Sequence, residues 1–386
     1  MAEAAAQAGA VVPAAGGRSR WPLALAAGAI AAFATFTISL GDVLTAHGRP
    51  EQALALPFNR TMPAWRVLAA DRGRPETPAM RQLAESSLAA SPVAAVPLTW
   101  LALAEQARGR GDRGQRLLAL SATTGWHDVV AQRQLYNLAV SRGDFTTALR
   151  HADALLRQGH GREELFARFD LGMARPGFRK AMADMVATSP GWPRDYIVGH
   201  GARLDDVALA SLLDARTRGG GTLAREIAVP LISGLLVAGR DAAAAGVWRR
   251  VGGADGMAAG TLAWRDGAMV FPAGVFDWQL PEGFRIEGVD NGTLVAGFDA
   301  VAEPARRMLA LPPGDWRLVP DQPDAVTGSW QWTIACRSGA AGPWLPLAAG
   351  QAATVRPGCP VQVLALRRTI GVEDSTLPEL RLERLR

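Results

Sequence analysis

The sequence predicts an α + β protein with several domains, in which one transmembrane helix precedes a helical region and an antiparallel β-sandwich. Three observations lead to this fold class. Residues 22–40 carry no charge, apolar residues recur at helical spacing as far as Gly252, and the spacing then changes to the alternation typical of strands. The chain has 386 residues, of which 49% are hydrophobic, so it is long enough for two globular domains beside the membrane segment.

The predicted transmembrane helix covers residues 21–41. Its uncharged run, PLALAAGAIAAFATFTISL, lies between Arg20 and Asp42 and would form a helix of about 30 Å, which matches the hydrocarbon core of a bilayer. Arg18 and Arg20 precede the run, whereas an acidic residue follows it. The positive-inside rule therefore places the N-terminus in the cytoplasm and the bulk of the chain on the other side.

Two alternatives to a membrane anchor stay open. A signal peptide also begins with basic residues and an apolar run, and the one small-residue cleavage site is Leu44-Thr45-Ala46. The run could also be a core helix. Residues 1–20, which are rich in Ala and Gly, are expected to form a disordered cytoplasmic tail in the anchored protein.

Composition bears on the compartment and on the partners. The net charge is +5, but basic residues are dispersed among acidic ones and no nucleic-acid-binding motif is present, so we do not expect a nucleic-acid partner. Lys180 is the single lysine, and Ala, Gly and Arg are abundant, which suggests GC-rich coding and a bacterium. We therefore predict a single-pass protein of the bacterial inner membrane with its bulk in the periplasm.

The two cysteines, Cys336 and Cys359, both lie in the last fifth of the chain. In an oxidising compartment they should form a disulfide, which would stabilise the fold by roughly 3 kcal/mol on the chain-entropy model. Two buried free thiols are the alternative.

Residues 42–252 are predicted to form an α-helical repeat domain. Apolar stripes at helical spacing include Phe145 to Leu156, which follows Asp144 as the expected N-cap. The tripeptides Arg110-Gly111-Asp112 and Arg142-Gly143-Asp144 recur 32 residues apart between helical patterns, so we expect the glycine to form the turn and the aspartate to cap the next helix. Residues 131–157 resemble a tetratricopeptide repeat, which implies an α-solenoid with an extended binding face. A spacer between the membrane and the C-terminal domain is the alternative role of this region.

Residues 253–386 are predicted to form the β-sandwich, because short alternating segments are separated by turn sequences. In the segment Trp330 to Cys336, alternation places both tryptophans on one face, which we expect to be core. The predicted strands cover residues 275–280, 284–289, 293–298, 306–311, 316–320, 330–336, 353–356, 361–368 and 377–385.

The segments VFDWQL, GTLVAGFDA, RRMLALPPGDWRLVPD and WQWTIACRSG, with the final Leu-Arg-Leu strand, resemble the jelly-roll sandwich of carbohydrate-binding modules and galactose-binding-like domains. The whole arrangement resembles a group of bacterial membrane-anchored tetratricopeptide proteins associated with exopolysaccharide or O-antigen assembly. This resemblance implies an architecture, and it defines no binding residue.

No catalytic, metal-binding or cofactor-binding residues are predicted. The five histidines are scattered and are expected at the surface, and phosphate-binding and dinucleotide-binding motifs are absent from the sequence. Sugars stack on aromatic rings, and of the six tryptophans after residue 253 we expect Trp344, in GPWLP, and Trp316, after the PPGD turn, to be the most exposed. Packing in the core is the alternative for both.

The leading functional prediction is a non-enzymatic scaffold or regulator of polysaccharide assembly or export, with protein partners in that machine. A carbohydrate-binding protein that recognises a glycan through the sandwich is the alternative. A glycan-modifying enzyme is a third possibility, which would require clustered carboxylates in one cleft.

Overall fold

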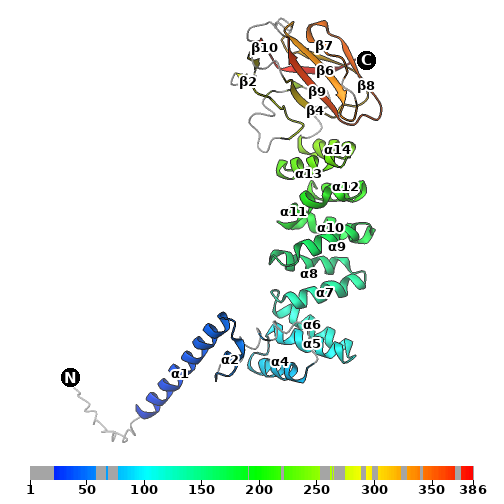
Figure 1. Cartoon of the computed structure of the whole chain (residues 1–386). Coiled ribbons are helices and arrows are strands. Elements are labelled where there is room, and N and C mark those ends of the chain that lie inside the picture. Colours follow the sequence, from blue (N-terminus) through cyan, green and yellow to red (C-terminus); the bar gives the residue numbers. More distant parts are fainter. Residues whose placement is uncertain are drawn as a thin grey trace, which may run out of the picture. The chain divides into compact units, whose positions relative to one another are not determined.

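In the computed structural model, shown in Figure 1, helices make up the N-terminal part and antiparallel sheets the C-terminal part. The residues that the structure describes are 21–57, 67, 77–189, 191–218, 221–252, 261–262, 264, 274–287, 293–297, 303–322, 328–339, 342–369 and 375–385. The predicted tail, residues 1–20, lies outside them. The change from helix to strand falls between Gly252 and Thr261.

The chain divides into two compact units. Met1–Arg142 and His151–Gln158 form the first, and Gly143–Arg150 and Gly159–Arg386 form the second. The second unit contains the last helices together with the sheets, so the change of secondary structure at Gly252 does not coincide with the division between the units.

The helices of the described chain follow one another with short connections. They are α1 (Trp21–Ala46), α2 (Pro50–Leu54), α4 (Pro78–Ala90), α5 (Ala95–Ala107), α6 (Gly111–Thr124), α7 (Val129–Ser141), α8 (Phe145–Arg157), α9 (Arg162–Met173), α10 (Pro176–Thr188), α11 (Trp192–His200), α12 (Asp206–Arg216), α13 (Arg225–Val237) and α14 (Asp241–Gly252).

Among the described residues, α1 is the one helix long and apolar enough to span a membrane. Its large apolar side chains, such as Leu25, Phe33 and Phe36, are exposed along its length. The buried positions in α1 are confined to its C-terminal half, on which α2 packs. The described chain therefore leaves most of the apolar surface of α1 uncovered.

Four helices of the described chain begin two residues after a glycine in the left-handed conformation. These glycines are Gly48 (φ 74°), Gly109 (φ 78°), Gly143 (φ 74°) and Gly239 (φ 72°), which precede α2, α6, α8 and α14. A residue with a Cβ adopts this conformation only with strain, so glycine is favoured at each turn. Gly109 and Gly143 are 34 residues apart.

The prediction for the second tripeptide is confirmed, because Asp144 accepts a hydrogen bond from the Thr147 amide at 3.1 Å. The prediction for the first tripeptide was wrong in register. Gly111 is the first residue of α6, and Gly109 forms the turn, with its amide donating to the Gln106 carbonyl at 2.9 Å. The end of α5 requires a left-handed residue at position 109, and the glycine there supplies it.

Three antiparallel sheets follow, with strand orders β1-β11-β5-β8, β10-β3-β2 and β4-β9-β6-β7. Buried side chains from all three sheets meet in one hydrophobic cluster that includes Trp264, Trp278, Trp316, Trp330 and Trp332. The strands are β1 (Thr261–Leu262), β2 (Phe284–Glu287), β3 (Thr293–Ala296), β4 (Ala305–Leu309), β5 (Gly314–Pro320), β6 (Trp330–Cys336), β7 (Leu345–Pro346), β8 (Ala352–Val355), β9 (Gln362–Arg368), β10 (Ser375–Leu377) and β11 (Leu380–Arg384).

The strand predicted at residues 275–280 was wrong. The segment turns instead, because the carboxylate of Asp277 accepts a hydrogen bond from the Gly274 amide at 2.6 Å and the Asp277 amide donates to the Gly274 carbonyl at 2.9 Å. Only Gln279 forms a bridge, to Arg306.

Within the second compact unit, the last helices contact the sheet region directly. Arg225 of α13 forms an ion pair with the fully buried Asp277. Trp248 of α14 stacks on Phe276, with 5.1 Å between the ring centroids. A further ion pair joins Arg337, after β6, to Asp241 at the start of α14 at 2.8 Å. Charge and aromatic contacts therefore hold α13 and α14 against the sheet region.

Candidate functional site

Trp316 is buried, with only 1% of its surface exposed, which corrects the exposure predicted from its place after the PPGD turn. Alternation along β5 places Trp316 and Leu318 on the inner face, in the hydrophobic cluster of the sheets. Its indole Nε1 donates to the carbonyl of Pro312 at 3.1 Å. The ring of Trp316 therefore has no face on which a sugar could stack.

Trp344 is half-buried and immediately precedes the edge strand β7. The guanidinium carbon of Arg367 lies 4.8 Å from the centroid of its ring, which is a cation–π contact. The preceding segment is fixed by Thr333 of β6, whose hydroxyl donates to the carbonyl of Gly342 at 3.1 Å. Trp344 thus keeps some exposure, while Arg367 occupies part of its ring.

The predicted disulfide between Cys336 and Cys359 is confirmed, with the two Cα atoms 5.6 Å apart. It joins the last residue of β6 to the turn that precedes β9. A pocket of about 390 Å³ lies beside this disulfide. This volume is within the range of small-molecule sites, about 300–1,000 Å³.

The pocket is built by β6, β8 and the start of β9. Gln362 is buried beneath it, where its side-chain oxygen accepts from the Leu311 amide at 2.8 Å and its amide nitrogen donates to the Cys359 carbonyl at 2.5 Å. These hydrogen bonds hold the side chain of Gln362 in the wall of the pocket. The residues that line the pocket are Ile334, Ala335, Cys336, Gly339, Gly342, Thr354, Val355, Arg356, Cys359 and Gln362.

Arg356 is the single ionisable side chain among the lining residues that the structure describes, and Thr354 adds a hydroxyl that hydrogen-bonds to Asp315 at 2.6 Å. This set offers apolar surface and a few hydrogen-bonding groups. Such a lining is suited to binding a small polar ligand.

A second polar cluster lies in the helical part, where the sequence predicted a surface histidine. His200 of α11 is half-buried, and its Nδ1 lies 2.8 Å from a carboxylate oxygen of Asp170 in α9. The other oxygen of Asp170 accepts from the Tyr196 hydroxyl at 3.0 Å. Burial raises the pKa of Tyr196 far above its usual range, and the neighbouring Asp170 raises it further. Phe166 packs against the rings of Tyr196 and His200, and Trp192 packs against Phe166.

The Asp170–Tyr196–His200 cluster was missed because its residues are 26 and 30 positions apart and meet only when α9 packs on α11. Across the part of the chain that the structure describes, no group of three or more His, Cys, Asp or Glu side chains is placed to hold a metal ion. Comparison with known proteins adds no functional residue, since neither a protein-family model nor a curated protein matches the sequence.

Proposed function

We propose that the protein is a non-enzymatic scaffold or regulator, anchored by α1 in a bacterial inner membrane, that acts in polysaccharide assembly or export. The observation that carries this proposal is the uncovered apolar surface of α1, for which a lipid bilayer is the fitting environment. The N-terminus lies in the cytoplasm and the bulk of the chain in the periplasm. The disulfide supports this placement, because disulfides persist in oxidising compartments.

The helices and sheets would then act as binding surfaces held above the membrane. Left-handed turn glycines 34 residues apart, and buried alanines such as Ala102, Ala131 and Ala148, support a solenoid of the tetratricopeptide type. The common aromatic core of the antiparallel sheets supports a jelly-roll-like sandwich. A scaffold of this kind binds protein partners of the machine.

Genetic complementation tests this function. Loss of the protein should lower the amount or the chain length of the exported polysaccharide, and the full chain should restore both. Residues 42–386 exported without α1 should restore neither, whereas α1 exchanged for an unrelated single-span helix should complement. An unchanged polysaccharide after loss of the protein contradicts the proposal.

A second candidate function, glycan binding by the sheet region, is favoured by the pocket beside the disulfide and by the partly exposed Trp344. The full-length protein in detergent would be titrated with an array of neutral oligosaccharides. We expect Arg356→Gln and Trp344→Ala to weaken binding, whereas Trp126→Ala, an exposed tryptophan of the helical part, should not. Flat titrations across the array would remove this candidate.

A further inference from the structure

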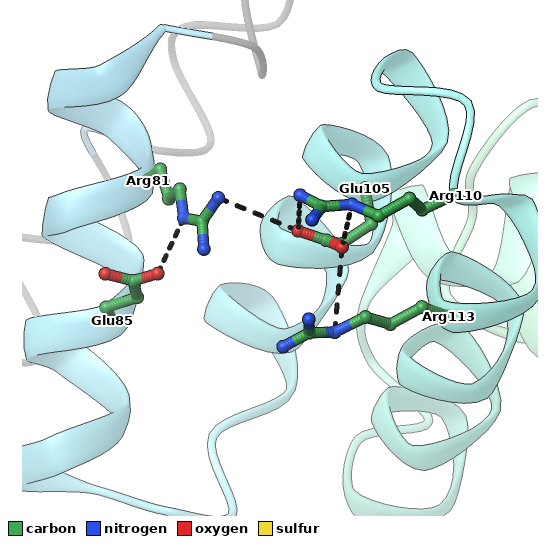
Figure 2. Close-up of polar contacts among 5 residues, drawn as sticks. All are labelled: Arg81, Glu85, Glu105, Arg110 and Arg113. Carbon is green, nitrogen blue, oxygen red and sulfur yellow. Dashed lines mark hydrogen bonds and ion pairs between the residues drawn. The ribbon is translucent and has the colours of Figure 1, made fainter.

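Three arginines converge on one buried carboxylate in the first compact unit, as Figure 2 shows. Glu105 of α5 has a side chain that is 4% exposed. Arg110 binds both of its oxygens, at 2.8 and 2.9 Å, while Arg113 of α6 lies at 3.6 Å and Arg81 of α4 at 3.8 Å. Arg81 also pairs with Glu85 at 2.7 Å.

The arginines of this cluster keep much of their surface in water. Arg110 and Arg113 have side chains that are 47% and 59% exposed. Each guanidinium group has five N–H donors. The single carboxylate of Glu105 can accept from only some of the donors of the three arginines. The cluster therefore presents positive charge and hydrogen-bond donors to an incoming anionic group.

Helix α6 also borders a groove on α7, which has a volume of about 370 Å³ and is lined by other residues than those of the cluster. Leu135, Leu138 and Ala119 supply its apolar surface, and Arg116 and Arg142 supply positive charge. The Arg142 guanidinium donates to the side-chain oxygen of Gln115 at 2.6 Å, which orients both side chains. The remaining lining residue is Asp112.

The arginines are arranged as a ridge. Arg110, which directly precedes α6, and Arg113 and Arg116 in its first turns are exposed and follow one another every three residues. Within a helix this spacing corresponds to steps of about 4.5 Å along the axis. Across the cluster and groove, five arginines face three carboxylates. A row of cations favours a ligand with anionic groups that repeat along a chain.

We propose that this ridge and groove bind an acidic polysaccharide through its carboxylate groups. The inference rests on the proposed function, because it names the polymer class that the scaffold would hold. Arginine suits this task, since its planar fork forms paired hydrogen bonds with a carboxylate. The apolar groove surface would contact the C–H faces of the sugar rings.

The groove favours a sugar acid over an acidic peptide because of its own acceptors. Asp112 is exposed in the groove and would repel the side chains of a polyglutamate-like segment. Sugar hydroxyls, by contrast, can donate to Asp112 while neighbouring carboxylates pair with Arg113 and Arg116. A uronic acid carries both kinds of group on each ring.

Calorimetric titration of the full-length protein in detergent tests the proposal, with oligogalacturonate as the probe. We expect the Arg113→Gln/Arg116→Gln double variant to bind about tenfold more weakly or worse, because it loses two charge-assisted contacts. The matched control is Arg194→Gln/Arg306→Gln, which removes the same charge from exposed arginines elsewhere. Arg116→Lys keeps the charge but loses the planar guanidinium group, so its affinity for the probe should lie between those of the wild type and the double variant.

The outcomes separate this inference from its rivals. Equal weakening in both double variants would show general attraction to the net positive charge and would overturn the proposal. Polyglutamate that binds as tightly as oligogalacturonate would indicate an acidic peptide instead, and an uncharged oligogalactose that binds equally would rule out carboxylate recognition. No binding by the wild type also overturns the inference, while a positive complementation result would leave the scaffold function standing.

Discussion

Glu105 is the buried residue on which the contacts of α4, α5 and α6 converge. Its replacement in Glu105→Gln removes the charge that Arg110 binds with two nitrogens. We expect the free energy of unfolding to fall by about 2 kcal/mol, because the charge-assisted hydrogen bond from Arg110 and the ion pairs of the buried carboxylate are lost, while the exposed guanidinium groups regain water. Urea denaturation measures this change.

Glu85→Gln is the matched control for Glu105→Gln. Glu85 also pairs with Arg81, but its side chain is 52% exposed, so we expect a loss below about 0.5 kcal/mol. Equal losses for the two variants would contradict the importance of burial at Glu105.

Asp277 makes the stability of the second compact unit depend on pH. Burial raises its pKa above the usual 3.8, although the Gly274 amide and Arg225 act in the opposite direction. A carboxyl with a raised folded-state pKa contributes stability below its unfolded pKa and loses this contribution as pH rises. The stability of Asp277→Asn relative to wild type should therefore increase as the pH rises from below 3.8 to neutral.

Urea denaturation of wild type and Asp277→Asn in a series of buffers across this range measures the difference. Asp315→Asn, which changes an acidic residue in β5, is the control. A difference between wild type and Asp277→Asn that stays constant with pH would be incompatible with a raised pKa at Asp277.

At the scale of single residues, the sequence predicted the disulfide but not the charged clusters. Cys336 and Cys359 could be paired because the chain contains no other cysteine. Glu105 and Arg81 come together only through the packing of α4 on α5, which local patterns do not encode. Trp316 lies close to a turn, which favours exposure, but its alternation with Leu318 along β5 places it in the core instead.

Replacement of a left-handed turn glycine between two helices should lower the stability of the fold. Gly143→Ala puts a Cβ on a residue with φ 74°, where no neighbouring atom lies within 4 Å, so its cost is backbone strain alone. We expect a loss of about 1 kcal/mol in unfolding free energy. Gly199→Ala, inside α11 and equally open, should be neutral or stabilising by up to about 1 kcal/mol. Thermal unfolding should separate the two variants, and equal destabilisation would contradict the turn's role.

The disulfide links β6 to the turn before β9, and its removal should destabilise the sheets. For Cys336→Ala/Cys359→Ala we expect a loss of about 3 kcal/mol, because the unfolded chain gains freedom. Denaturation of wild type with and without dithiothreitol provides the control, since the reduced protein should resemble the double variant. Oxidised wild type no more stable than the variant would refute this.

Helices and strands were predicted where the pattern is local. The apolar residues Leu165, Phe166, Phe169 and Met173 recur at helical spacing and are buried in α9, and the strand at residues 330–336 has the predicted bounds. The segment at 275–280 failed because its turn depends on Asp277, whose partner Arg225 lies 52 residues earlier. The two-residue strands β1 and β7 are too short to show alternation.

For the molecule as a whole, attachment to the membrane depends on α1. We expect the full-length protein to stay with membranes after alkaline carbonate extraction and its mass to include residues 1–46. Ile30→Arg/Phe33→Arg, at exposed positions of α1, should release it, because charge in the bilayer core costs several kcal/mol. Ile38→Leu is a neutral control. A mature N-terminus near His47 would show instead that α1 is a cleaved signal peptide.

The contacts of α13 and α14 with the sheet region determine how the protein can be divided for experiments. A fragment that starts at residue 253 would keep Asp277 and Phe276 but lose Arg225 and Trp248, which exposes an aromatic face and leaves a buried acid without its partner. A fragment that starts at Gly159 retains all four. The sheets are therefore best produced and studied together with the helices from α9 onward.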